Sequence, residues 1–297
     1  MTKFFTTIAL LGAVCAFSAG IFGRNGLDIG FGSAFVYDHA KQYIAGDAVI
    51  DGKVQALEID WISGSVSVTA SPDDTVTITE ITDKSLNDDM RVHWWLDGST
   101  LRIKFCASGL KLYSNYGKKA LTVSVPETLL LSELDIDSAS ADVRVNAAGA
   151  KTIRVDTASG DVTFDNSCDM QSIRIDTASG KQSITAGHAE TAKLNSASGS
   201  IRITADTIEN LNVNTASGDI RCNLQEAPDE CRIDTASGKV EVGLPEDAGF
   251  TLKVSTASGR LNSDFAMKKT DKTYTCGDGE GRIKIDTASG NINLIAK

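Results

Sequence analysis

The chain has 297 residues, 41% of them hydrophobic and only 4 of them proline, which excludes a disordered or low-complexity protein. The formal net charge of −10 argues against a nucleic-acid partner, because binding a phosphate backbone needs a basic surface. The three histidines stand far apart in the sequence, so no cluster predicts a zinc site.

The chain begins with an apolar segment. Residues 4–22 carry no charge, and their length is close to the roughly 20 residues that a helix needs to cross a bilayer. Two interpretations of residues 1–24 stay open. Small residues at Ala16 and Ser18 favour a cleaved signal peptide, whereas the apolar run up to Phe22 favours an uncleaved anchor. Either predicts export of the rest, with the Gly-rich residues 25–47 as a linker.

Residues 48–135 predict β-strands without a clean repeat. Apolar residues alternate with polar ones, as at Val66 and Val68, which places them on one face of a strand. Asp97-Gly98 lies between two apolar runs and predicts a hairpin. We expect this region to cap the repeats that follow it.

A five-residue motif organises residues 136–297. It reads Asp-Thr-Ala-Ser-Gly at 156–160 and returns, with small changes, at 176–180, 195–199, 214–218, 234–238, 255–259 and 286–290. A degenerate copy stands at 137–141, and a more degenerate one at 60–64. In the latter, Trp61-Ile62 would suit a first coil that needs covering. A short, nearly fixed period is the signature of a repeat array, in which no unit buries its apolar face alone.

Apolar residues alternate on both sides of each copy. Ile153 and Val155 precede the motif, and Val162 and Phe164 follow it, so each copy contributes two strands with apolar inner faces. Two short strands and two tight corners in about 20 residues predict an all-β fold in which each copy is one coil of a β-solenoid. Successive coils would pair at about 4.8 Å. Only the apolar N-terminal segment is expected to be helical.

The corner residues carry a structural prediction. Each final glycine is expected to allow a positive φ. These structural-turn residues are Gly160, Gly180, Gly199, Gly218, Gly238, Gly259 and Gly290. Thr157 and Ser159 are expected to bond the turn backbone. Residues 264–281 are expected to be a loop off the coil. Because the chain stops at Lys297, shortly after Leu294, the last coil is expected to present an open strand edge.

Three features together resemble a known family. They are the repeated Thr-Ala-Ser-Gly motif, the Leu-Pro-Glu-Asp-Ala-Gly-Phe segment at 244–250 and the Gly-rich run before Arg282. They resemble the bacterial putative-adhesin β-strand-repeat family, exported proteins of unknown function. The resemblance covers about residue 48 to the end. It implies a right-handed, parallel β-helix-like fold at the cell envelope and brings no catalytic residues.

Charged residues form two rows on the outer face of the first strand of each coil. The basic row, a candidate binding face, consists of Arg154, Arg174, Lys193, Arg232, Lys253 and Lys284. Two residues further on, the acidic row consists of Asp156, Asp176, Asp234 and Asp286. The rows either track an anionic glycan or cell-wall polymer or neutralise each other. We favour neutralisation, because stacked like charges repel.

Other chemistry has little support. No nucleophile–base pair is recognisable, so an enzyme is not expected. The Asp row could offer oxygens to calcium, but Asn and Ser interrupt it, and no cofactor is predicted. Five cysteines follow Cys15, an odd count that does not predict a disulfide framework. Cys222 and Cys231 flank one turn on inward positions, and we favour free thiols.

We therefore predict a non-enzymatic protein of the cell envelope. Residues 4–22 would contact the membrane, with the repeats outside the cytoplasm acting as a surface adhesin or polymer-binding module. The alternative is an envelope scaffold that self-associates through the uncapped C-terminal coil, at strand 291–295.

Overall fold

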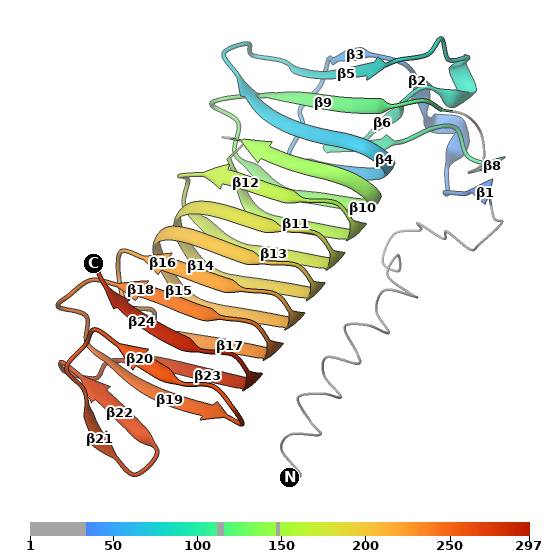
Figure 1. The fold of residues 1–297 in the computed structure, drawn as a ribbon. Helices are drawn as coiled ribbons and strands as arrows, with labels where there is room; N and C mark the ends of the chain where they lie inside the picture. The colour runs from blue at the N-terminus through green and yellow to red at the C-terminus, as the bar shows by residue number, and fades with distance from the viewer. Residues whose placement is uncertain (1–33, 112–115, 147–148) are drawn as a thin grey trace. The chain divides into compact units, whose positions relative to one another are not determined.

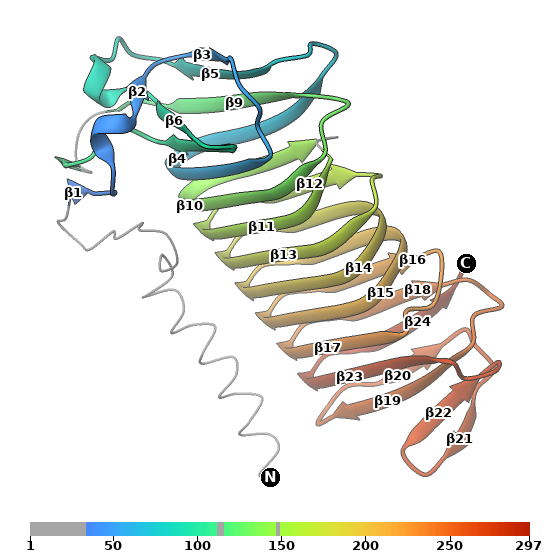
Figure 2. The same ribbon diagram turned by 180° about the vertical axis from the view of Figure 1, so that it is seen from behind.

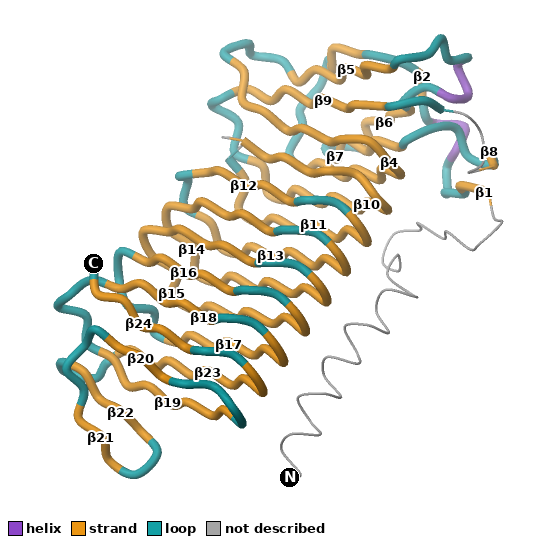
Figure 3. Tube along the Cα trace, in the orientation of Figure 1, coloured by secondary structure: helices purple, strands orange, loops and turns teal. Residues whose placement is uncertain are grey.

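The computed structural model describes residues 34–111, 116–146 and 149–297 (Figure 1). This part of the chain is all β, and its only helices are two 3-10 turns, η1 (Ala40–Gln42) and η2 (Asp88–Met90) (Figure 3). None of its helices is long and apolar enough to span a membrane. The predicted N-terminal helix, within residues 1–24, lies outside the described residues. The chain divides into two compact units between Val162 and Thr163.

The N-terminal unit is built on parallel pairing of long strands. Its strands are β1 (Ala34–Phe35), β2 (Ile44–Ala45), β3 (Ala48–Ile50), β4 (Ala56–Ser71), β5 (Val76–Thr82), β6 (His93–Asp97), β7 (Thr100–Lys104), β8 (Leu110–Lys111), β9 (Lys119–Pro126), β10 (Leu131–Asn146) and β11 (Ala150–Ser159). One edge of β4 pairs with β10, which in turn pairs with β11. The other edge of β4 pairs with β7 and then with β9. The strand with the degenerate first motif copy is therefore an inner strand.

Antiparallel strands close this unit beyond β7 and β9. Strand β6 pairs with β7 through the hairpin predicted at Asp97-Gly98, where Gly98 has a φ of +62°. Strand β5 pairs with β9, and β3 pairs with β5. The sequence predicts that Trp61 helps to cover the first coil, and this is wrong. Trp61 is fully buried and meets the Phe105 ring edge-to-face at 4.9 Å. The expected covering is supplied by antiparallel strands instead.

The linker prediction is wrong for residues 34–47. Phe35 and Tyr37 are buried, β1 pairs with β8, and β2 pairs with β6. The Tyr37 hydroxyl donates to the Cys106 carbonyl at 3.0 Å. Scattered aromatic residues therefore fasten this segment to the unit, a signal that the neighbouring glycines conceal in the sequence. The linker prediction for residues 25–33 lies outside the described residues.

A buried lysine fastens the interior of the same unit. The Lys119 ammonium lies 4.0 Å from the centroid of the Phe105 ring and 2.7 Å from a Glu80 carboxylate oxygen. It also donates to the Met90 carbonyl at 2.7 Å. Burial lowers the pKa of Lys119, and hydrogen bonding to Glu80 opposes that shift. A buried charge of this kind persists because its partners replace the water that it loses.

The C-terminal unit is a solenoid-like stack of parallel strands (Figure 2). Its strands are β12 (Val162–Asn166), which starts at the last residue of the other unit, β13 (Met170–Ser179), β14 (Gln182–Ser198), β15 (Ile201–Ser217), β16 (Ile220–Leu224), β17 (Glu230–Ser237), β18 (Val240–Leu244), β19 (Phe250–Thr256), β20 (Leu261–Ser263), β21 (Lys268–Thr270), β22 (Thr273–Cys276), β23 (Gly281–Ser289) and β24 (Ile292–Ala296). Equivalent motif positions face each other, as Thr177 faces Ser196. The all-β, parallel-strand prediction is confirmed, whereas the handedness of the coil stays a prediction.

The core follows the alternation seen in the sequence. Pairs that flank the motif, such as Ile201 with Ile203 and Leu211 with Val213, are at most 2% exposed. The threonine of the motif also points inward, as Thr215 and Thr235 are fully buried. Cys222 and Cys231 are buried and free, as the sequence favours.

The corner glycines are required mainly by close backbone approach. A Cβ added to Gly199 would lie 2.0 Å from the carbonyl oxygen of Gly180, and one on Gly218 would lie 2.1 Å from that of Gly199. The predicted positive φ occurs at Gly160, Gly180, Gly238 and Gly290. It does not occur at Gly199, Gly218 and Gly259, so the prediction is wrong there. What the corners share is stacking too tight for a side chain.

The prediction of an uncapped C-terminal coil is wrong. Strand β23 pairs with β17 on one edge and with β19 on the other, and β24 lies in the same way between β18 and β20. The insertion at 264–281 is not a plain loop, because it holds β21 and β22, and β22 covers the far edge of β19. The last motif copy is therefore an inner coil, and the strand 291–295 offers no open edge for assembly.

Candidate functional site

Charged residues line the outward face of four adjacent strands in the N-terminal unit. In register order across β7, β4, β10 and β11, one row contains Arg102, Glu58, Asp135 and Arg154. The next row, two residues further along each strand, contains Lys104, Asp60, Asp137 and Asp156. We call these two rows the N-terminal ladder. Neighbouring strands lie about 4.8 Å apart, so each side chain lies beside its equivalent on the adjacent strand of the ladder.

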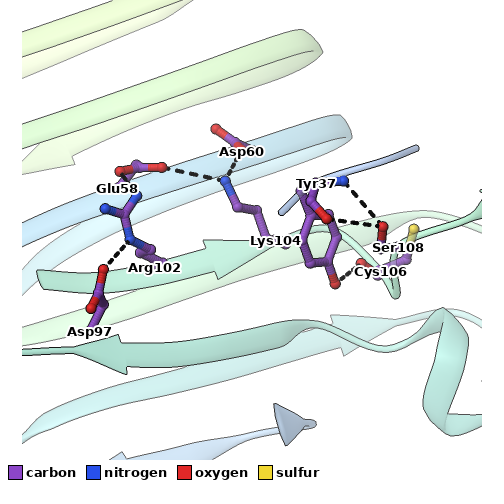
Figure 4. Close-up of polar contacts among 8 residues, drawn as sticks. All are labelled: Tyr37, Glu58, Asp60, Asp97, Arg102, Lys104, Cys106 and Ser108. Carbon is purple, nitrogen blue, oxygen red and sulfur yellow. Dashed lines mark hydrogen bonds and ion pairs between the residues drawn. The ribbon is translucent and has the colours of Figure 1, made fainter. Parts of the chain in front are cut away.

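The cations of β7 neutralise the carboxylates of β4 (Figure 4). Arg102 pairs with Glu58 and, through Nε, with Asp97 at 3.2 Å. Lys104 pairs with Asp60 and lies 3.4 Å from Glu58. The side chains of Lys104 and Asp60 are each only 3% exposed. Burial raises the pKa of Asp60, although Lys104 opposes the shift. Such a pair is costly to break, because the remaining charge would be buried alone.

Two tyrosines cover this end of the ladder. The Lys104 ammonium lies 5.9 Å from the centroid of the Tyr37 ring, and the Tyr37 backbone N–H donates to the Ser108 hydroxyl at 3.1 Å. The Tyr43 ring meets that of Tyr37 edge-to-face at 4.8 Å. Burial raises the pKa of both tyrosines, so both stay protonated and neutral. Residues 34–47 therefore shield the ion pairs from water.

The carboxylates of β10 have fewer cations. Arg154 pairs with Asp156 and lies 3.7 Å from Asp135, but no cation pairs with Asp137 in the part of the chain that the structure describes. Burial, with Asp135, Asp60 and Asp156 nearby, raises the pKa of Asp137 to about 8. Burial likewise raises the pKa of Asp135 to about 6. The centre of the ladder therefore holds a proton at neutral pH.

The C-terminal unit carries the rest of the predicted rows, and we call them the C-terminal ladder. Arg174 pairs with Asp176 at 2.6 Å, Arg232 with Asp234 at 2.6 Å, and Lys284 with Asp286 at 2.5 Å. Each pair joins residues i and i+2 on one strand. The neutralisation favoured from the sequence therefore holds at these three positions.

Two members of the predicted basic row have no carboxylate partner among the described residues: Lys193 and Lys253. Asn195 and Ser255 stand at the positions that hold Asp in other copies. Asn195 instead donates its amide to Asp176 and accepts one from Asn214 at 2.8 Å. These side-chain amides therefore hydrogen-bond to one another and to Asp176 without forming an ion pair with Lys193. Both lysines are exposed.

The sequence prediction missed six of the eight residues of the N-terminal ladder. Glu58, Asp60, Arg102 and Lys104 were not among the predicted site residues, nor were Asp135 and Asp137. Their signal is the same as that of Arg154: an apolar–charged–apolar–charged run, as in 57–60, 101–104 and 134–137. This run occurs without a full motif, which is why a search for the motif overlooks it. No three His, Cys, Asp or Glu side chains of the described ranges are arranged to hold a metal ion.

Comparisons place the fold among known proteins. The model of the family described as Toastrack DUF4097 matches residues 54–295. No match was found among curated proteins. The match to the family model agrees with the resemblance that the repeated motif indicates.

Three solved structures are similar to the chain. One is a putative lipid binding protein from Parabacteroides distasonis ATCC 8503, at 18% identity and a TM-score of 0.48, covering 84% of this chain and 96% of that chain. Another is a putative adhesin from Parabacteroides merdae ATCC 43184, at 12% identity and 0.47, covering 86% and 96%. The third is a putative adhesin from Bacteroides fragilis NCTC 9343, at 16% identity and 0.44, covering 86% and 98%.

Proposed function

This chain belongs to the Toastrack DUF4097 family, and we propose that it is a non-enzymatic binding module of the cell envelope that holds an anionic polymer. The observation that carries the proposal is that Lys193 and Lys253 have no carboxylate partner among the described residues, whereas the other cations of the C-terminal ladder are neutralised. An ion pair already made within the protein offers a ligand little, whereas a free ammonium attracts an anion directly.

The spacing of the two lysines supports a polymer as the ligand. Register places Lys193 beside Asn212, then Arg232, Lys284 and Lys253 on successive strands. Four strand spacings of about 4.8 Å separate the two lysines by about 19 Å. A single small anion does not reach both, but an extended chain with repeated carboxylates or phosphates does. Paired strands hold this distance fixed, which lowers the entropic cost of binding.

Binding of polygalacturonate, a polyanionic glycan, tests the proposal. Isothermal titration calorimetry in low salt would compare the wild type with the Lys193→Gln, Lys253→Gln double variant. We expect the double variant to bind roughly tenfold more weakly, since it loses two charge contacts. Lys284→Gln is the matched control, because Lys284 lies on the same face but is paired with Asp286. Equal affinity of the wild type and the double variant would overturn the proposal.

We further propose that the repeats lie outside the cytoplasm, with residues 4–22 in or processed at the membrane. The support is the uncharged length of that segment and its position before the repeats. Protease treatment of intact cells, followed through a C-terminal epitope, checks this orientation. Loss of the epitope is the expected result. Protection until lysis would place the repeats inside and remove the surface role.

A further inference from the structure

The last two strands of the chain occupy a slot between strands made earlier. Strand β23 hydrogen-bonds to β17 and β19, and β24 to β18 and β20 (Figure 2). The chain makes β19 and β20 first, adds the β21–β22 hairpin, and only then returns to fill the gap. Removing β23 and β24 would leave four strand edges unpaired. Unpaired edges readily accept another strand.

A short glycine-rich connection leads into the slot. Residues 277–280 join β22 to β23, and Gly277 and Gly279 have positive φ values of +56° and +78°. Cys276 and Gly281 both face Phe250, one on each side of β19. The connection therefore crosses two strand spacings, about 10 Å, and passes round the end of β19. It is the connection through which β23 and β24 are joined to the strands that precede them.

The inserted pair is held by contacts that any copy of the chain can supply. Ile283, Ile285, Ile292 and Leu294 are at most 2% exposed, so the pair is stable only inside a slot. Its register is set by motif positions, since Thr287 faces Thr235 on one side and Thr256 on the other. An identical strand pair from another molecule would find the same side chains and the same register.

We propose that this slot accepts the C-terminal strand pair of a second copy, so that two chains form a strand-exchanged dimer. The exchange is reciprocal: each molecule donates β23 and β24 and receives those of its partner, as a two-fold dimer requires. It differs from stacking on an open coil, because no new type of contact forms. The inference goes beyond the proposed polymer binding and does not depend on it.

The length of the connection gives the test. Deleting Gly279 and Glu280 leaves three Cα–Cα steps of about 3.8 Å, or about 11 Å, which is too short to cross about 10 Å and also round the strand end. The full-length deletion variant should therefore dimerise in size-exclusion chromatography with light scattering. Inserting two glycines after Gly277 is the matched control and should favour the monomer. Shortened hinges are a known route to exchange.

Cross-linking identifies the exchange itself. Lys253 and Lys284 are register partners on β19 and β23, and both are exposed. In a mixture of ¹⁴N- and ¹⁵N-labelled chains refolded together, an amine cross-linker should join these lysines as mixed-isotope pairs in the dimer fraction. A monomeric deletion variant, or a dimer with only same-isotope Lys253–Lys284 pairs, overturns the proposal. If the deletion variant does not fold, wild-type protein refolded at rising concentration tests the proposal. Mixed-isotope Lys253–Lys284 cross-links in its dimer fraction support strand exchange, and their absence overturns it.

Discussion

The two ladders are made from the same alternation of charged residues, yet the N-terminal ladder has an excess of carboxylates and the C-terminal ladder an excess of cations. Across β7, β4, β10 and β11 the N-terminal ladder sets three cations against five carboxylates. The C-terminal ladder sets five cations of the predicted basic row against three aspartates. In the N-terminal unit the surplus carboxylates are largely buried, and in the C-terminal unit the surplus lysines are exposed.

Burial decides what a surplus charge does. Asp137, largely removed from water and beside other carboxylates, holds a proton, because neutralisation costs less than ionisation there. Lys193, in water, keeps its charge and is available to a ligand. The N-terminal ladder is therefore a source of stability and pH dependence, whereas the C-terminal ladder is a surface for binding.

Lys104→Met should break the N-terminal ladder with the largest effect. It leaves Asp60 buried without its cation, and we expect a loss of about 3–5 kcal/mol in the free energy of unfolding at pH 7. The loss should shrink at low pH as Asp60 takes a proton. Urea unfolding followed by tryptophan fluorescence measures it, since Trp61, Trp94 and Trp95 all lie in the N-terminal unit.

Lys284→Met is the control for that change in the C-terminal ladder. Its side chain is 46% exposed, so its pair with Asp286 should contribute less than about 1 kcal/mol. Circular dichroism follows this variant, because the C-terminal unit contains no tryptophan. Similar losses in the two variants would contradict the difference in burial.

Asp137→Asn should stabilise the N-terminal unit, and increasingly so as the pH rises. The pKa of Asp137 rises from an ordinary 3.8 to about 8 on folding, so between these values the folded state binds a proton that the unfolded state lacks. Wild-type stability therefore falls as the pH increases through this range, and Asp135, with a pKa of about 6, adds to the fall. Asparagine is not subject to this loss. We expect a gain on the order of 3 kcal/mol at pH 8 and almost none near pH 4.

The equivalent change in the other ladder should have the opposite sign. Asp176→Asn removes the partner of Arg174, whose side chain is 34% exposed, and should cost less than about 1 kcal/mol. Urea unfolding at pH 4, 6 and 8 compares the two variants. A stabilising Asp176→Asn, or an Asp137→Asn without pH dependence, would show that the two ladders do not differ as described.

Gly199→Ala should disrupt the stacking of neighbouring coils in the C-terminal unit. Its Cβ would lie 2.0 Å from the Gly180 carbonyl oxygen, and neighbouring coils must separate to admit it. We expect a loss of about 2 kcal/mol in thermal or urea unfolding. Gly98→Ala is the control, because Gly98 has a φ of +62° but open space around it, and should cost about 1 kcal/mol. Equal costs would mean that close backbone approach does not explain the corner glycines.

The sequence predicts the coils well but not their order at the ends. The period fixes which residues point inward, as Leu211 and Val213 show, because alternation depends only on local geometry. The order of stacking depends on which coil fills which gap, and the motif copies are nearly interchangeable. In each unit, the stacking order of one strand pair differs from its order in the sequence. Strands β7 and β9 follow β4 in the sequence but pair with the edge of β4 that faces away from β10. Strands β19 and β20 precede β23 and β24 in the sequence but lie beyond them in the stack. Nothing in a repeated motif distinguishes this order from the sequential one.

The candidate site was predictable in part for a related reason. The pairing of Arg232 with Asp234 follows from their spacing on one strand. The surplus of carboxylates around Asp137 requires knowing that β4 lies beside β10, which sequence distance hides. The burial of Lys104 could not be predicted either, because the ring that covers it belongs to Tyr37, in a segment whose sequence predicts a linker.

The salt dependence of polygalacturonate binding tests the central claim. The claim is that Lys193 and Lys253, which have no carboxylate partner in residues 34–111, 116–146 and 149–297, are the ligand-binding charges. The slope of log affinity against log salt counts the cations that the polymer neutralises. Relative to the wild type, the Lys193→Gln, Lys253→Gln variant should have a slope smaller by about 1 to 2, and Lys284→Gln should change it little. Identical slopes for the wild type and the double variant would contradict the account.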